Sequence, residues 1–315
     1  MKLDISRHQS VLVNEVISHL VVKQEGIYVD CTLGFGGHSS AILSRLGQSG
    51  RLIGIESDPE TCSEARLKVN DQRFEAVLGT YQKIDFHLIE RGITKVDGIF
   101  ADLGVSSAQL DQPGKGFSFR LDGPLDMRMD PDLQTAEEIV NTWSTEDLAR
   151  IFREYGEEPK AWKIATAIEE ERRRSRIVST VQLAELVHRV YHFQKGRIDT
   201  ATKIFQALRI TVNHELENLE TLLSKSQRLL NSGGRIAIIS YHSLEDRIVK
   251  NFFRDKSRSC TCPKELPECR CGGIKLMSLI TRKCIFPDEN EISLNPRSRS
   301  ARLRVAEYLG SKTET

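Results

Sequence analysis

The sequence predicts an α/β protein with a Rossmann-like parallel sheet, into which a small helical domain is inserted. From residue 26 to about 102, short β-rich runs alternate with amphipathic stretches, which is the pattern of βαβ units. The next strand-like run, 235–240, comes about 130 residues later. Ordinary crossover connections are much shorter, so a separate domain is expected in that interval.

The sheet is predicted from six β-rich runs, which are 27–31, 51–56, 74–78, 97–103, 235–240 and 302–309. Apolar residues recur at helical spacing in three intervals between them, 39–46, 60–69 and 81–92. Gly233 and Gly234 precede the fifth run and are expected to end one long helix over 205–223.

Helix-capping patterns identify helices in the inserted domain. Ser179 and Gln182 form a capping-box pair before an amphipathic run, and Ser144 is placed to cap another helix. The sheet domain is therefore predicted to comprise residues 1–106 and 206–315, and the inserted helical domain residues 107–205.

Composition excludes several classes of protein. The 315 residues are 39% hydrophobic and 28% charged, and they contain no apolar run long enough to span a bilayer. The N-terminal segment lacks the features of a secretory signal, and seven cysteines do not suit a disulfide framework. We expect a cytoplasmic protein without a membrane partner, and the sequence does not indicate its oligomeric state.

Charge is unevenly distributed along the chain. The whole chain carries +1, but residues 247–304 contain 14 Lys and Arg against six Asp and Glu. That segment is therefore +8 and the remainder −7, which points to a polyanionic partner. A basic surface that meets only solvent gives the same count, so this alternative stays open.

A glycine-rich turn from Asp30 to His38 joins the first strand to the first helix. Glycines let a ligand approach the backbone, and the helix N-terminus offers free N–H groups. The dinucleotide fingerprint needs glycine where this chain has Ser39, which disfavours a pyrophosphate and favours S-adenosyl-L-methionine (SAM). Glu56 is placed to hold the ribose hydroxyls, and Asp30 to hold the ammonium directly or through water. The alternatives are glycines with a purely steric role, or a nicotinamide-dependent oxidoreductase.

Asp102 ends the fourth predicted strand, at the edge of the sheet where doubly wound folds bind ligands. An exocyclic base amine is a poor nucleophile because its lone pair is delocalised into the ring. A carboxylate that accepts its N–H bonds, helped by a carbonyl of Leu103 or Gly104, would aim the nitrogen at a methyl donor. Asp102 is therefore the predicted catalytic residue, and its alternative role is to cap the following loop.

The segments that resemble the RsmH (MraW) family are GFGGH (34–38), DLGVSS (102–107), GFSF (116–119) with GPLDMRMD (123–130), YHSLEDR (241–247) and NPR (295–297). Members of that family are SAM-dependent methyltransferases that modify N4 of a cytidine in the decoding region of 16S rRNA. The resemblance implies this reaction, SAM as the methyl donor, and 16S rRNA in the small ribosomal subunit as the partner. The alternative is a SAM-binding ribosome-assembly factor without turnover.

The resemblance also implies the cofactor contacts and assigns substrate recognition to the inserted domain. By motif, the SAM contacts fall on Gly36, Gly37, His38, Glu56, Tyr81, Asp102 and Gln109. Many members have Asp in place of Glu56, and Phe is common in place of Tyr81. Glu reaches the ribose with one more methylene and Tyr keeps a ring face for adenine, so SAM binding is expected to survive both changes.

Four cysteines near the C-terminus could supply thiolates to a structural zinc: Cys260, Cys262, Cys269 and Cys271. Their C-x-C spacing departs from the usual C-x2-4-C pattern. We therefore assign no metal, while a zinc site and free thiols in a surface loop both stay open.

Four arginines are expected to alternate along the final strand, so that they share one face and form a candidate phosphate-binding patch: Arg297, Arg299, Arg302 and Arg304. Ser243 is expected to cap a helix with Asp246 as its partner. Arg128 is expected to meet RNA phosphate or to hold its loop by ion pairs. Trp143 and Trp162 are expected in the core of the inserted helices.

Overall fold

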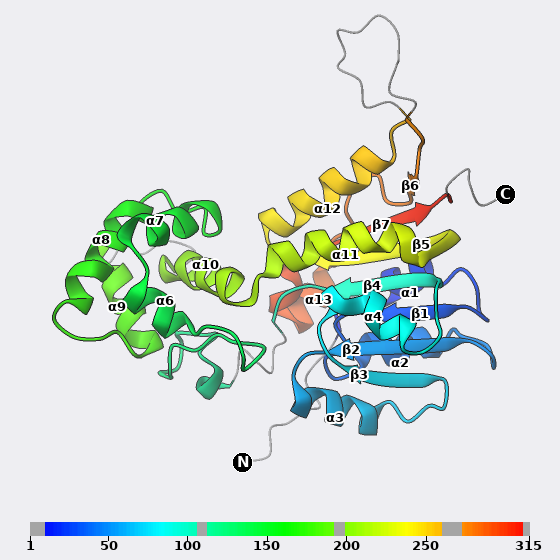
Figure 1. Ribbon diagram of the computed structural model, residues 1–315, viewed down its shortest axis with the longest axis horizontal. Coiled ribbons are helices and arrows are strands. Elements are labelled where there is room, and N and C mark those ends of the chain that lie inside the picture. Colours follow the sequence, from blue (N-terminus) through cyan, green and yellow to red (C-terminus); the bar gives the residue numbers. More distant parts are fainter. Residues whose placement is uncertain (1–9, 106–111, 192–198, 260–272, 311–315) are drawn as a thin grey trace, which may run out of the picture. The chain divides into compact units, whose positions relative to one another are not determined.

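The computed structural model describes residues 10–105, 112–191, 199–259 and 273–310. The chain divides into two compact units, residues 1–104 with 216–315, and residues 105–215 (Figure 1). The second boundary lies ten residues later than the predicted 205, because the helix over 201–213 packs on the inserted helices. Both ends of the chain therefore build the sheet unit, and the helical unit is an insertion.

Seven strands form one sheet in the order β3-β2-β1-β4-β5-β7-β6. Their bounds are β1 Ile27–Asp30, β2 Arg51–Glu56, β3 Phe74–Leu78, β4 Val96–Asp102, β5 Leu230–Ser240, β6 Met277–Leu279 and β7 Arg302–Tyr308. The first five strands are parallel, and β7 is antiparallel to both of its neighbours. The predicted Rossmann-like class is confirmed. The strand order reverses between β1 and β4, where doubly wound sheets bind ligands.

Helices cover both faces of this sheet (Figure 1). They are α1 Val13–Leu20, α2 Gly37–Leu43, α3 Pro59–Lys68, α4 Ile84–Ile89, α11 Glu215–Leu229, α12 Ser243–Lys256 and α13 Glu289–Leu294, with 3-10 turns η2 Tyr81–Lys83 and η4 Pro296–Ser300. Successive strand residues point to opposite faces. Val29 thus packs in the core beneath α4, α11 and α12, whereas Tyr28 packs beneath α1 and α2.

The inserted unit has a hydrophobic core of its own, in which Phe152, Ile164 and Leu208 are fully buried. Its elements are η3 Pro113–Lys115, α6 Ala136–Thr142, α7 Thr145–Glu154, α8 Ala161–Arg172, α9 Thr180–Val190 and α10 Ala201–Asn213. The predicted caps at Ser144 and at Ser179 with Gln182 are confirmed. No helix in the described part of the chain is long and apolar enough to cross a membrane.

The two tryptophans of the inserted unit have different surroundings. Trp143 is partly buried against the core, as expected. Trp162 is 51% exposed, so its assignment to the core is wrong. It lies on α8, where Ala161, Ile164 and Ala165 supply the buried face instead.

The helix predicted over 205–223 is two helices. α10 ends at Asn213, and His214 adopts a left-handed φ of 50° before α11 begins. The Asn213 side-chain amide donates to Met127 O and accepts from Met129 N–H, both at 2.8 Å. The end of α10 therefore holds the loop that contains Met127 and Met129. Helical spacing of apolar residues continues across the break, which is why the sequence pattern did not reveal it.

Gly233 and Gly234 do not end a helix, because α11 has already ended at Leu229. They lie within β5, where the register against β4 shifts between Val96 and Gly98. Gly233 has φ 81°, which a side chain would disfavour. The glycines therefore form an irregular stretch at the start of the strand.

Candidate active site

The predicted site residues of the sheet unit gather at one edge because parallel strands end together. Asp30 ends β1, Glu56 ends β2, Asp102 ends β4, and Tyr81 begins the turn that follows β3. The Tyr81 ring is partly buried against the core beneath α4. Gln109 lies outside the described residues. Hydrogen bonds join Asp30, Glu56 and Asp102 to residues of the glycine-rich turn or of the helix that follows it.

The turn between β1 and α2 contains three glycines with different constraints. Gly34 has φ 50°, and a Cβ there would meet nothing nearer than a backbone oxygen at 4.0 Å. Gly36 has φ 78°, and its Cβ would lie 2.3 Å from a Val69 methyl carbon. A Cβ on Gly37 would lie 2.0 Å from the Ser10 hydroxyl. Packing thus explains Gly36 and Gly37 without a ligand, whereas the open space lies at Gly34.

Glu56 is tied to this turn through its carboxylate. Gly34 N–H donates to Oε2 at 2.9 Å, and Asp58 N–H donates to Oε1 at 3.0 Å. Burial raises the pKa of Glu56, and these backbone donors oppose that shift. The carboxylate is therefore fixed in place beside the open space at Gly34.

Asp30 is buried completely, and its carboxylate is held by protein groups. Ser39 Oγ donates to Oδ2 at 2.7 Å, and Thr32 N–H donates to Oδ1 at 3.1 Å. A direct contact between Asp30 and a ligand ammonium is therefore not supported, because no surface of the residue is accessible. Ser39, where the dinucleotide fingerprint has glycine, serves to pair with this buried acid.

Asp102 is held from the backbone and from its side chain. Its N–H donates to Thr32 Oγ1 at 2.6 Å, and the Tyr241 hydroxyl donates to Oδ1 at 2.9 Å. Burial raises the pKa of Asp102 to about 7, and the Tyr241 hydrogen bond works against this shift. The Asp102 side chain is 22% exposed, so a substrate atom can still reach it.

His38 lies beside Asp102 as a buried, neutral ring. Its Nε2 is 2.8 Å from Val11 O, which can only accept, so the proton is assigned to Nε2. Nδ1 lies 3.8 Å from Asp102 Oδ2, and the ring packs against Phe100. Burial lowers the pKa of His38, so it does not supply a cation to neutralise Asp102 near pH 7.

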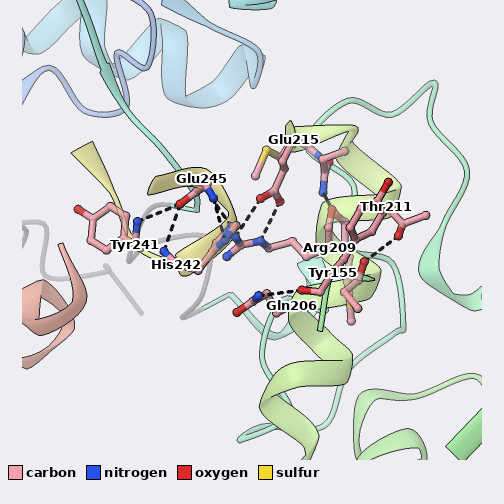
Figure 2. A network of polar contacts seen from close by, with 12 residues as sticks. Tyr155, Gln206, Arg209, Thr211, Glu215, Tyr241, His242 and Glu245 are labelled. Atoms are coloured by element: carbon pink, nitrogen blue, oxygen red, sulfur yellow. Dashed lines mark hydrogen bonds and ion pairs between the residues drawn. The ribbon is translucent and has the colours of Figure 1, made fainter. Parts of the chain in front are cut away.

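Tyr241 is a site residue to which the sequence assigned no role. It follows β5 directly, and its N–H donates to Glu245 Oε2 at 2.9 Å, as Figure 2 shows. Burial, followed by the nearby Asp102 carboxylate, raises the pKa of the Tyr241 hydroxyl, so it stays a proton donor. Its place at a strand end beside β4 was the signal that could have identified it.

The cap of α12 differs from the expectation. His242, rather than Ser243, is the N-cap, and Glu245, rather than Asp246, completes the capping box. Figure 2 shows Glu245 reaching back to both Tyr241 and His242. The prediction was one residue too late, because an imidazole replaces the usual hydroxyl acceptor. Asp246 does not take part in the capping box, and it is buried.

The predicted face of four arginines is wrong. Arg297 and Arg299 lie in η4, outside the last strand. Arg304 pairs with Asp246 at 2.7 and 3.1 Å and is 11% exposed, and Arg302 lies 3.6 Å from the same carboxylate. The two strand arginines therefore anchor α12 to β7.

In the inserted unit, the structure shows the loop-holding role for Arg128. Its guanidinium pairs with Asp126 at 2.7 and 3.0 Å and donates to Pro131 O at 2.6 Å. The side chain thus closes its own loop over residues 126–131.

The four cysteines considered for zinc lie outside the described residues.

Comparisons with known proteins agree over nearly the whole chain. Curated relatives named "Ribosomal RNA small subunit methyltransferase H" include one from Fusobacterium nucleatum, 47% identical over 98% of this chain and 99% of its own, and one from Maridesulfovibrio salexigens, 49% identical over 96% of each. A solved structure of a SAM-dependent O-methyltransferase from Thermotoga maritima is 10% identical, with a TM-score of 0.44, over 98% of this chain and 70% of its own. This similarity is too distant to assign a function. The model of the MraW methylase family matches residues 5–309. The chain therefore belongs to the MraW methylase family, methyltransferases for which SAM is the methyl donor.

Proposed function

We propose that this methyltransferase modifies the exocyclic N4 amine of a cytidine in the decoding region of 16S rRNA. The names of the relatives support an rRNA substrate of the small subunit. The observation that carries the acceptor assignment is the partly exposed Asp102 carboxyl, held by Tyr241 at the end of β4. Membership of a methylase family overturns the alternative of a nicotinamide-dependent oxidoreductase.

Asp102 performs two tasks in this proposal. In its ionised form it accepts an N–H bond of the amine, which draws the nitrogen lone pair out of conjugation and orients it. The amine becomes acidic once its new C–N bond forms, and a carboxylate whose pKa lies at about 7 can take up the released proton. Thr32 fixes the backbone of Asp102 by accepting from its N–H, and the Tyr241 hydroxyl holds the carboxyl itself in one orientation.

The glycine-rich turn and its neighbours fit SAM, which supplies an electrophilic methyl group when bound. The open space at Gly34 lets a ligand reach the backbone, and the fixed Glu56 carboxylate retains acceptor capacity for ribose hydroxyls. Tyr81 offers a ring for adenine at the neighbouring strand end. Gly36, Gly37, His38 and Gln109 complete the set that the family resemblance assigns. Asp30 supports this set indirectly, through Ser39.

The inserted unit is proposed to recognise the substrate, as a separate body with its own core. Residues 105–215 contain 16 Lys and Arg against 18 Asp and Glu, a net charge of −2. General attraction of phosphates is therefore not its contribution. A base that must leave its stack to reach a carboxyl instead needs shape and hydrogen bonding around it, which favours a folded ribosomal substrate. Action on the small ribosomal subunit would place the protein in the cytoplasm.

The test is methyl transfer from labelled SAM to small ribosomal subunits that lack the modification, followed by nuclease digestion and mass analysis of the labelled nucleoside. N4-methylated cytidine is the expected product. Label on another nucleoside would refute the acceptor assignment while leaving the methyltransferase intact. SAM binding without transfer to any RNA would support an assembly factor without turnover.

A further inference from the structure

Helix α12 has two chemically different sides. Val249 and Phe253 are buried in the core together with residues of the sheet. Arg247, Lys250 and Arg254 are exposed and succeed one another at spacings of three and four residues, so they lie along one side of the helix. No Asp or Glu occurs between the first and the last of them, and Arg254 Nε lies 3.2 Å from Oδ1 of the following residue, Asp255. These three residues are called the α12 basic stripe below.

The stripe is held in a fixed position relative to the active site. The buried Asp246 carboxylate receives Arg304 at 2.7 and 3.1 Å, which joins the first turn of α12 to β7. Tyr241, whose hydroxyl contacts Asp102, stands just before the N-cap of the same helix. At about 1.5 Å per residue, the stripe begins about 8 Å along the helix axis from its N-cap. Tyr241 therefore links the Asp102 carboxyl to the start of the helix that bears the row of cations.

Basic residues continue the stripe at the far end of the helix. Leu276 N–H donates to Lys256 O at 3.0 Å, which brings the segment after residue 273 alongside the end of α12. Arg258 and Lys275, one on each of these segments, are both exposed. Residues 260–272 add no net charge, so the described parts of 247–304 retain the full +8. Residues 247–258 and 273–276, which form most of α12 and the segments at its end, thus contain six Lys and Arg against one Asp.

We propose that the α12 basic stripe binds the phosphate backbone of the RNA strand whose base lies at Asp102. The inference rests on the proposed function and adds to it the surface that receives the flanking nucleotides. Lys and Arg neutralise phosphates without reading sequence, so the stripe supplies affinity and register rather than base choice. It also explains how a chain of net charge +1, with an acidic inserted unit, attracts a polyanion.

The test compares two triple variants of the full chain with the same change in charge. R247Q/K250Q/R254Q removes the stripe. R45Q/R51Q/K68Q removes three exposed cations at the opposite edge of the sheet, where β2 begins and where α2 and α3 end. Binding to unmodified small subunits and to 16S rRNA is measured over a series of salt concentrations, with SAM affinity and thermal midpoint as checks on folding.

The stripe variant is expected to bind more weakly, with a salt dependence flatter by about 2 in the logarithmic slope, since each lost phosphate contact on a single strand contributes about 0.7. The loss should appear in KM for the RNA. The control variant should keep the slope of the unaltered protein. The single variant K250Q, with an expected slope change of about 0.7, repeats the test with the least disturbance to the helix.

Equal slopes and equal KM in the stripe and control variants would overturn the proposal. The unaltered protein tests the proposed function separately, through its methyl transfer to RNA. If it methylates RNA while the stripe variant behaves like the control, only the assignment of the stripe fails. If the unaltered protein neither binds nor methylates any RNA, both proposals fall. A stripe variant that loses binding to phosphatidylserine vesicles but keeps its RNA slope would mark the stripe as a membrane contact and refute the proposal.

Discussion

The Tyr241 hydroxyl donates to Asp102 Oδ1 at 2.9 Å, although the two residues are 139 positions apart in the chain. Asp102 ends β4, and Tyr241 directly follows the neighbouring parallel strand β5, whose register sets Asp102 opposite Ile239. The Tyr241 backbone is fixed in turn by Glu245. Sheet register therefore determines where the hydroxyl meets the carboxyl, and it leaves Oδ2 for a substrate.

Tyr241→Phe is expected to move the acidic limb of the kcat–pH profile to higher pH. The Tyr241 hydrogen bond lowers the pKa of Asp102 against the effect of burial, so its loss raises that pKa above about 7. A hydrogen bond worth about 1 kcal/mol corresponds to a shift of about 0.7 pH units. At pH 7 the rate should fall several-fold, and it should recover in part at pH 9. The measurement is single-turnover methyl transfer across this pH range.

The other groups that face Asp102 remain in this variant: His38 from α2, Glu245 from α12 and Asp30 from β1. None of them replaces the lost donor, since His38 presents an unprotonated Nδ1 and the other two are acids. A merely structural role for Tyr241 would lower the rate by the same factor at every pH. An unmoved acidic limb would therefore show that Tyr241 does not position Asp102.

Asp102→Asn should abolish most turnover while stabilising the fold at alkaline pH. The isosteric amide can still accept from Tyr241, but it cannot take up a proton, and a loss of about 10²- to 10³-fold in kcat is expected. The folded pKa of about 7 exceeds the ordinary 3.8, so ionisation of Asp102 costs stability as pH rises from about 4 to 7. The full cost is present above pH 7.

The stability difference is measured by urea unfolding at pH 8 and pH 3.5. At pH 8 the Asn variant should be more stable, by no more than about 4 kcal/mol and by less in practice because the carboxyl is partly exposed. At pH 3.5 the two proteins should unfold at similar urea concentrations. A variant with unaltered turnover would remove Asp102 from the mechanism altogether.

Much of the sheet could be predicted because its strands are short apolar runs with polar or glycine boundaries. Strands β2 and β3 match their predicted limits, and β1 and β4 differ by one residue. Strand β6 has three residues, and α1 was not predicted at all. The break at His214 preserves helical spacing on both sides, so periodicity alone gives no sign of it.

The site divides in a similar way. Residues that end strands, such as Glu56 and Asp102, were predictable because topology alone brings strand ends together. The contacts of Tyr241 and Arg304 were not, because they depend on registers between strands that are distant in sequence. An alternating row of arginines indicates a shared face, but it does not show whether that face meets solvent or a buried acid such as Asp246.

Glu56→Gln is expected to weaken SAM binding by about tenfold, because neutral acceptors form hydrogen bonds roughly half as strong as those of a carboxylate. The amide oxygen can still accept from Gly34 or Asp58, but not from both with full strength. Burial raises the pKa of Glu56, so the affinity of the unaltered protein should approach that of the variant as pH falls. Titration calorimetry at pH 8 and pH 5 measures both effects.

Glu60→Gln, an exposed change in the first turn of α3, is the matched control and should leave SAM affinity unchanged. If both variants bind SAM as tightly as the unaltered protein at pH 8, Glu56 does not contact the cofactor and serves only to fix the glycine-rich turn.

Arg304→Gln should destabilise the fold by about 2 to 4 kcal/mol without changing the salt dependence of RNA binding. The loss leaves the buried Asp246 carboxylate with only the more distant Arg302, and an uncompensated buried charge is costly. Adding Asp246→Asn should recover part of the loss. Urea unfolding of the single and double variants gives the coupling, and a flattened salt slope would restore Arg304 as a phosphate contact.

Gly36→Ala should lower stability more than the same change at Gly92, because the two glycines share a positive φ but differ in their surroundings. Gly92 has φ 64° with no atom within 4 Å of an added Cβ, so it carries only the backbone cost of about 1 kcal/mol. At Gly36 the added Cβ would also lie 2.3 Å from the Val69 methyl carbon, and overpacking adds about 1 to 3 kcal/mol. Introducing Gly36→Ala into a Val69→Ala background should reduce its cost to that seen at Gly92. An equal cost in both backgrounds, measured by urea unfolding, would show that the turn moves away from Val69 and that packing does not require glycine at this position.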